Sequence, residues 1–95
     1  MEWTLNYKSS VKKDFNKIGY IEAQKIISSL NSFIENFSEE QEKILLKKET
    51  IKKLKGDMEG CYRLRLRTYR VIYKKNLNEL IILVVRVGHR KDVYE

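Results

Sequence analysis

The apolar residues of the first 37 positions change their spacing twice. Tryptophan, leucine and tyrosine alternate with polar residues over residues 2–8, which is the period of a strand with one buried face. Apolar residues then recur at helical spacing over 11–18, up to Gly19, and form a wider apolar stripe over 20–37. Because a single residue separates these two stretches, we expect two neighbouring antiparallel helices.

The second half of the chain predicts three further strands. Residues 62–67 alternate arginine with tyrosine or leucine, and residues 69–74 and 79–87 are rich in branched and aromatic side chains. Residues 75–78 between them suit a hairpin turn. Residues 38–53 combine a helix-like start with weak apolar spacing, so a short third helix and an ordered loop both remain open.

This order of elements, β-α-α-(α)-β-β-β, predicts an α+β fold. We expect a small two-layer sandwich, in which a two-helix hairpin packs on one face of a twisted, mainly antiparallel four-stranded sheet. Ninety-five residues suit a single domain that spans 1–95.

Strand alternation divides the side chains of the last three strands between two faces. Seven apolar residues are predicted to face the helices: Leu64, Leu66, Val71, Tyr73, Leu83, Val85 and Val87. The opposite face is predicted to carry Arg63, Arg65, Arg70, Arg86, Gly88 and Arg90. Ile72, Ile82 and Val84 share the parity of the arginines, which predicts apolar surface beside them and a partner site rimmed by charge.

The charge of the chain is concentrated in the same region. The formal net charge is +7, and every arginine lies in residues 60–95, where nine lysines and arginines face three acids. Guanidinium groups are planar, permanently charged and suited to phosphate. A solvated outer face is the simpler interpretation of alternating charges, whereas a basic region favours nucleic acid, a ribosome-like surface or an acidic protein as partner.

Several other classes of protein are not indicated. No apolar run approaches the length of a membrane span, and the first residues lack the pattern of a secretory signal, so a cytoplasmic location is expected. One cysteine and one histidine form no recognisable zinc spacing and allow no internal disulfide. We therefore predict no metal site and no cofactor.

Four segments resemble the RelE branch of the RelE/ParE toxin superfamily. They are Leu54-Lys55-Gly56, Tyr62-Arg63-Leu64-Arg65, Tyr69-Arg70-Val71-Ile72-Tyr73, and the ending Arg86-Val87-Gly88-His89-Arg90-Lys91-Asp92-Val93-Tyr94. The helical hairpin after a first strand, the length and the basic balance also agree, so the resemblance covers nearly the whole chain.

The resemblance implies the toxin of a type II toxin–antitoxin pair, with an antitoxin, the ribosome and mRNA as partners. Active members of that branch cleave mRNA in the ribosomal A site by attack of a ribose 2′-hydroxyl on the adjacent phosphate, without a metal, and so inhibit translation. The catalytic residues implied by motif position are Arg63, Arg65, Arg70, His89, Arg90 and Tyr94. The RNA-binding residues that we expect around them are Lys52, Lys53, Lys55, Arg67, Arg86 and Lys91.

The chain departs from the best-studied members of that branch at two positions. Those members have lysines at the positions of Arg63 and Arg65, and arginine effectively cannot lose its proton. His89 is then the side chain that titrates near neutral pH, as base or, with substrate bound, as acid. Some relatives also use a glutamate just before the Leu-Lys-Gly segment, and Glu49 is the nearest candidate here.

Two other functions stay open at this stage. One is a ParE-like protein that inhibits DNA gyrase through protein contacts. The other is a toxin-fold module whose main partner is an antitoxin and whose catalytic activity was weakened by the lysine-to-arginine changes.

Overall fold

The three-dimensional structure is a computed structural model that describes residues 2–89. Three candidate site residues, Arg90, Lys91 and Tyr94, lie outside this range. The described elements follow in the order β1 (Thr4–Tyr7), α1 (Val11–Ile18), α2 (Tyr20–Glu35), α3 (Glu39–Lys47), β2 (Ile51–Lys53), a short 3₁₀ turn η1 (Gly56–Met58), β3 (Tyr62–Leu66), β4 (Tyr69–Asn76) and β5 (Ile81–His89).

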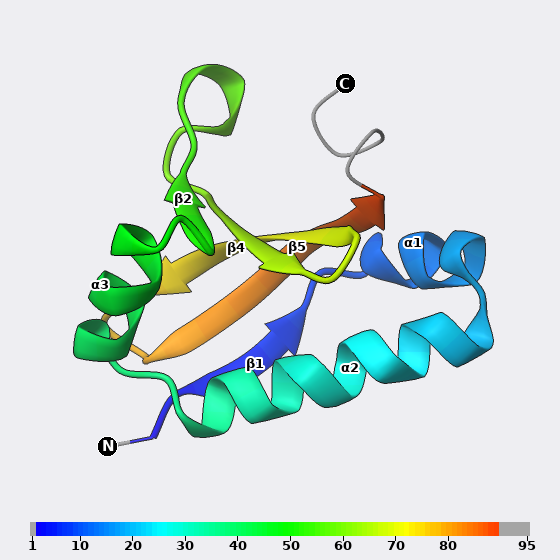
Figure 1. The fold of residues 1–95 in the computed structure, drawn as a ribbon, viewed down its shortest axis with the longest axis horizontal. Coiled ribbons are helices and arrows are strands. Elements are labelled where there is room, and N and C mark those ends of the chain that lie inside the picture. Colours follow the sequence, from blue (N-terminus) through cyan, green and yellow to red (C-terminus); the bar gives the residue numbers. More distant parts are fainter. Residues whose placement is uncertain (1, 90–95) are drawn as a thin grey trace.

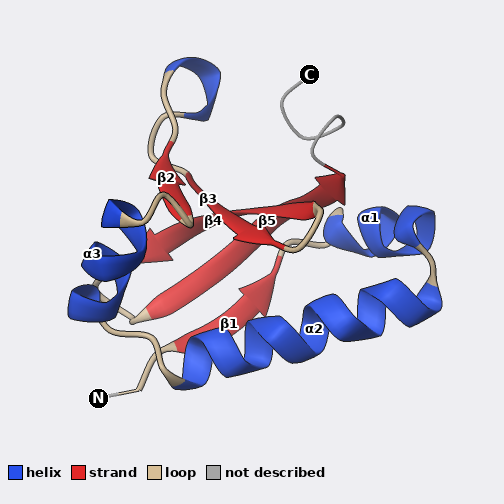
Figure 2. Cartoon of the chain, in the orientation of Figure 1, coloured by secondary structure: helices blue, strands red, loops and turns tan. Residues whose placement is uncertain are grey.

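The five described strands form one sheet in the order β1-β5-β4-β3-β2 (Figure 1). The first strand, β1, runs parallel to β5, whereas the other neighbouring pairs are antiparallel. The helical hairpin of α1 and α2 lies along one side of the sheet, and the β2–β3 connection projects from it on the side away from α2 (Figure 2). The predicted α+β fold is confirmed, but the predicted number of strands was one too low.

Residues 38–53 account for that difference, because they hold both a helix and a strand. Ser38 begins α3 by accepting a hydrogen bond from the backbone N–H of Gln41 at 3.0 Å, which satisfies one of the free donors of the first turn. Leu45 and Leu46 of this helix pack against the core. The strand β2 that follows has three residues, too few for an alternation pattern to show in the sequence.

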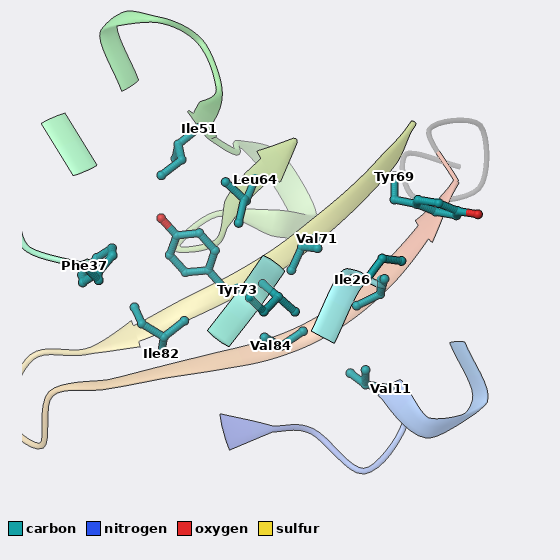
Figure 3. Close-up of a cluster of buried hydrophobic side chains, with 12 residues drawn as sticks. Val11, Ile26, Phe37, Ile51, Leu64, Tyr69, Val71, Tyr73, Ile82 and Val84 are labelled. Carbon is teal, nitrogen blue, oxygen red and sulfur yellow. The ribbon is translucent and has the colours of Figure 1, made fainter. Parts of the chain in front are cut away.

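The core lies between the three helices and the sheet face that they cover. It is built from side chains of every helix and strand, among them Val11, Ile26, Ile51, Leu64, Val71, Tyr73 and Val84 (Figure 3). Tyr73 is the largest of the fully buried side chains. We call the opposite side of the sheet the outer face.

A bulge in β5 changes which of its residues face the core. Ile72 lies opposite Arg86 in the β4–β5 register, but the next residue, Tyr73, lies opposite Val84. Val85 is the extra residue of the bulge. The residues of β5 that precede it therefore face the side of the sheet opposite to the one that alternation counted from Arg86 would predict.

The predicted parity was therefore wrong for part of β5. Ile82 and Val84 belong to the core, whereas Leu83 and Val85, which we expected to face the helices, lie on the outer face. The prediction held beyond the bulge, where Val87 is buried in the core.

Candidate nucleic-acid interface

Five cationic side chains lie on the outer face, in the part of the sheet that β1 does not reach. They are Lys52, Arg63, Arg65, Arg70 and Arg86, from β2, β3, β4 and β5, and we call them the arginine face. Two rows run across the strands. In one, Lys52 lies opposite Arg63, and Ile72 lies between Arg63 and Arg86. In the other, Arg70 is flanked by Arg65 and Gly88.

Arg65 and Arg70 lie directly opposite each other in the β3–β4 register. Directly paired residues have Cβ atoms only about 4.5–5.5 Å apart, and like charges in such a pair destabilise a sheet. Arg65 is exposed, whereas Arg70 is 6% exposed and donates a hydrogen bond from Nη1 to the carbonyl oxygen of Tyr69 at 3.3 Å. The register therefore places two arginines next to each other on the outer face, one exposed and one buried.

Arg63 is held in place by the backbone. Arg63 is 6% exposed, and its guanidinium donates from Nη2 to the carbonyl oxygen of Glu49 at 2.6 Å. Glu49 follows α3 with a φ of 61°, a left-handed conformation that costs a residue with a side chain roughly 1–2 kcal/mol. The Nε atom of Arg63 is buried and has no hydrogen-bond partner among residues 2–89. The sequence suggested the Glu49 carboxylate as a catalytic group, but the contact in the structure is made by its carbonyl.

A small apolar cluster lies on the outer face, next to the residues of the arginine face. Cys61 and Ile72 are buried in it, with Leu54, Met58 and Val85 packed around them. Ile72 is thus covered by the β2–β3 connection and does not form the exposed apolar surface that we expected beside the arginines. Half-buried Leu83 and Val85 of β5 take its place on the outer face.

His89 lies on the other side of the sheet from the arginine face. It is opposite Tyr69 in the β4–β5 register, and the two rings make an edge contact with centroids 5.0 Å apart. Tyr69 belongs to the core on the helix side. The strand alternation that brings Arg70 and Gly88 together on one side therefore directs His89 toward α1.

The other predicted RNA-binding residues are dispersed. Lys53 lies opposite Tyr62, on the parity opposite to Lys52, and Lys55 immediately precedes η1. Arg67 lies in the β3–β4 turn with a φ of 57° and is exposed.

Lys74, which the sequence analysis missed, lies on the outer face opposite Leu83. Its even spacing from Arg70 could have identified it.

A buried polar network, which no sequence pattern indicated, fastens α3 to β4. Glu42 is 4% exposed, and its carboxylate accepts hydrogen bonds from the Tyr73 hydroxyl and from Lys75 Nζ, both at 2.6 Å. Burial raises the pKa of the Tyr73 phenol, and its hydrogen bond to Glu42 raises it further. Burial lowers the pKa of Lys75, but its hydrogen bonds to Glu42 and Glu39 outweigh this effect, so the pKa is raised.

The described part of the chain contains no cluster of three or more His, Cys, Asp or Glu side chains that could hold a metal ion. Among the same residues, no helix is both long and apolar enough to span a membrane.

Comparison with known proteins identifies the family to which this chain belongs. The family model described as ParE toxin of type II toxin-antitoxin system, parDE, matches residues 5–94. The chain therefore belongs to this toxin family, within the RelE/ParE superfamily that its motifs resemble. A comparison with curated proteins found no significant match.

Solved structures of related toxins share the fold. The archaeal RelE–RelB complex from Pyrococcus horikoshii OT3 matches with a TM-score of 0.66 and 20% identity over 98% of this chain and 100% of that chain. The isolated RelE toxin of E. coli matches with a TM-score of 0.63 and 25% identity, covering 97% and 90%. YafQ of E. coli strain BL21(DE3) matches with a TM-score of 0.65 and 17% identity, covering 99% and 100%.

Proposed function

We propose that this toxin is a metal-independent endoribonuclease that cleaves mRNA in the ribosomal A site and thereby inhibits translation. The observation that carries the proposal is the arginine face, where cationic residues of four neighbouring strands share one surface and Arg65 lies opposite Arg70. Two like charges in register weaken a sheet. A phosphate bound beside Arg65 and Arg70 could accept hydrogen bonds from both guanidinium groups.

In the proposed reaction, the 2′-hydroxyl of a ribose loses its proton to solvent water, and its oxygen attacks the adjacent phosphorus. The bond to the 5′-oxygen breaks and this oxygen takes a proton from water, which leaves a cyclic phosphate and a 5′-hydroxyl. Negative charge develops on the phosphate oxygens, and positioned cationic donors stabilise it. Arg70 and Arg65 bind this phosphate, while Arg63 sits beside them in the orientation that the Glu49 carbonyl imposes.

His89 is less suited to proton transfer at the arginine face, because its ring packs on Tyr69 on the helix side. The proposal therefore assigns most of the rate enhancement to arginine-based charge stabilisation and substrate positioning. Arg90 and Tyr94 keep the roles that family resemblance implies for them, with Arg90 holding the phosphate or assisting the leaving group and Tyr94 orienting the substrate.

Single-turnover cleavage of mRNA on programmed ribosomes tests this function. Primer extension should reveal new 5′ ends within codons in the presence of the toxin. Arg65→Ala and Arg70→Ala should suppress these ends, whereas Lys43→Ala, at an exposed position of α3, should not. Intact mRNA and continued translation with the unmodified chain would contradict the proposal and favour a toxin-fold module without catalytic activity.

The partner that we propose is an antitoxin, since related toxins were solved in complexes with RelB antitoxins. On this chain, the outer face offers half-buried Leu83 and Val85 next to the cationic Lys74 and Arg86. An antitoxin segment with apolar and carboxylate side chains would suit both kinds of surface.

A ParE-like inhibitor of DNA gyrase is the second candidate function, and the description of the matching family model favours it. A supercoiling assay with purified gyrase separates the two candidates. Inhibited supercoiling together with undisturbed translation would replace the ribonuclease proposal.

A further inference from the structure

A cavity of about 260 Å³ lies where α1 packs against the end of β5. It exists because β1 ends at Tyr7, opposite Val84, so the last residues of β5 have no strand beside them on that edge. Asp14 of α1 compensates for the missing strand: its Oδ2 atom accepts a hydrogen bond from the backbone N–H of Val87 at 2.9 Å. The helix thus closes the edge and forms one wall of the cavity.

The groups that line the cavity combine positive charge with ring surface. Lys17 of α1 and Arg86 of β5 supply cationic groups, and Tyr69 and His89 supply the two rings in edge contact. Asp14 contributes a carboxylate. Cations bind phosphate, aromatic and imidazole rings stack on bases, and a carboxylate accepts hydrogen bonds from the amino group of a base.

The cavity and the arginine face are continuous around the edge of the sheet. Arg86 belongs to the arginine face by its register with Ile72 and also lines the cavity. Gly88 lies opposite Arg70 and lines the cavity as well, and it has no side chain that would stand between the two. An RNA strand whose phosphate is held at Arg70 can therefore reach the cavity past Gly88.

We propose that this cavity binds one nucleotide of single-stranded RNA next to the scissile phosphate. Its phosphate contacts Lys17 and Arg86, its base packs against His89, and Asp14 accepts a hydrogen bond from an amino group of the base. The inference rests on the proposed function, because it extends the same RNA site. It assigns the α1 residues Asp14 and Lys17 to RNA recognition and predicts a preference for bases that carry an amino group.

Titration of the full chain with mononucleotides, followed by ¹⁵N–¹H NMR, tests the inference without a ribosome. Cytidine 5′-monophosphate and uridine 5′-monophosphate form a matched pair, since they differ in an amino group against a carbonyl. We expect cytidine 5′-monophosphate to shift the amide signals of Lys17, Gly88 and His89, with an affinity several-fold higher than that of the uridine nucleotide or of inorganic phosphate.

Three variants assign the contacts. Lys17→Ala should weaken binding of both nucleotides several-fold, whereas Lys12→Ala, at an exposed position elsewhere on α1, should leave it unchanged. Asp14→Asn should remove the preference for cytidine, because the amide oxygen can still accept the Val87 N–H but the negative charge is gone. Equal affinity for both nucleotides and for inorganic phosphate in the unmodified chain would overturn the inference.

Two further outcomes would also overturn it: signal changes confined to residues of the arginine face, or shifts at Lys17 and Gly88 caused by an acidic peptide and by no nucleotide. The cleavage assay is independent of this measurement. Cleavage without nucleotide binding in the cavity refutes the inference alone, whereas binding without cleavage refutes only the proposed ribonuclease function.

Discussion

At the scale of single residues, the Arg65–Arg70 pair should trade stability for activity. Arg65→Thr removes the repulsion and introduces a residue with high strand propensity, so we expect stability to rise by about 0.5 kcal/mol in urea denaturation. The same variant should lose cleavage on the order of 100-fold, since removal of one positioned donor typically costs about 3 kcal/mol. Lys74→Thr is the matched control, because it lies on the same face opposite Leu83. Equal effects of the two variants would contradict a special role for the pair.

Substitutions of Glu49 distinguish the role of its carbonyl, which binds Arg63, from a catalytic role of its carboxylate. Glu49→Ala keeps the carbonyl that binds Arg63, so the single-turnover cleavage rate should stay within about twofold of the unmodified chain if only that carbonyl matters. Glu49→Gly should do the same and also relieve the left-handed conformation. A loss of roughly 100-fold or more in both variants, the scale of a general base, would instead identify the carboxylate as catalytic.

A substitution of His89 distinguishes a role in proton transfer from a role in RNA binding. A histidine that transfers protons at the scissile bond would produce a limb near neutral pH in the rate profile. Because His89 lies on the α1 side, we expect His89→Gln to raise the RNA concentration needed for half-maximal cleavage and to leave the shape of the profile unchanged. A variant that loses this limb and about 100-fold in rate would restore His89 as acid or base.

At the scale of elements, the contact between α3 and β4 should depend on the Tyr73 hydroxyl. Tyr73→Phe leaves the buried Glu42 carboxylate with one hydrogen bond fewer, which should cost about 1–3 kcal/mol in the free energy of unfolding at pH 7. Tyr62→Phe is the control: its ring stacks on Tyr73 at 5.2 Å between centroids, and this contact needs no hydroxyl.

The same contact should weaken in alkaline solution. The pKa values of Tyr73 and Lys75 are raised in the folded state above their ordinary values of 10.0 and 10.5. Their contribution is therefore complete below pH 10 and declines as pH rises above it, because the unfolded chain loses these protons first. Denaturation between pH 7 and 11 should show this decline, and Tyr73→Phe should make it shallower. An unchanged slope would contradict the assignment to Tyr73.

The elements also show how far sequence patterns reach. The stretch 11–18 was predicted with the bounds that α1 has, because its apolar spacing and Gly19 mark both ends. The arginines of β3 and β4 were assigned to one face by simple alternation, and the register agrees. The bulge at Val85 was not predictable, since an extra residue among six consecutive apolar positions leaves the composition of the strand unchanged.

Position in the fold, by contrast, decided which candidate residues share a site. His89 and Arg86 are three positions apart in β5, so strand alternation directs one toward α1 and the other to the outer face, although the family resemblance had placed both in one RNA site. The Glu49 carbonyl could not have been inferred, because a sequence pattern carries no information on backbone acceptors. Lys17 and Asp14 were missed for a related reason: they reach the edge of β5 through tertiary packing of α1.

At the scale of the whole molecule, the outer face combines apolar and cationic side chains. Antitoxin binding should therefore depend both on apolar contacts and on the salt concentration. Leu83→Asp should weaken copurification with a co-expressed antitoxin, because it places a carboxylate in the apolar part of the outer face. Leu77→Asp is the control, since Leu77 is 60% exposed in the β4–β5 hairpin. Rising salt should reduce the affinity, as expected for a cationic surface. A complex equally insensitive to Leu83→Asp and to salt would place the antitoxin elsewhere.

The pairing of β1 with β5 joins residues 4–7 to residues 81–84. During synthesis, β1 is made long before β5, its partner in the sheet. The strand β4 also lacks its second neighbour until β5 has been made. Both Arg86 and the contact between Asp14 and Val87 depend on β5. A nascent chain therefore has no complete arginine face until β5 has been synthesised and has paired with β4.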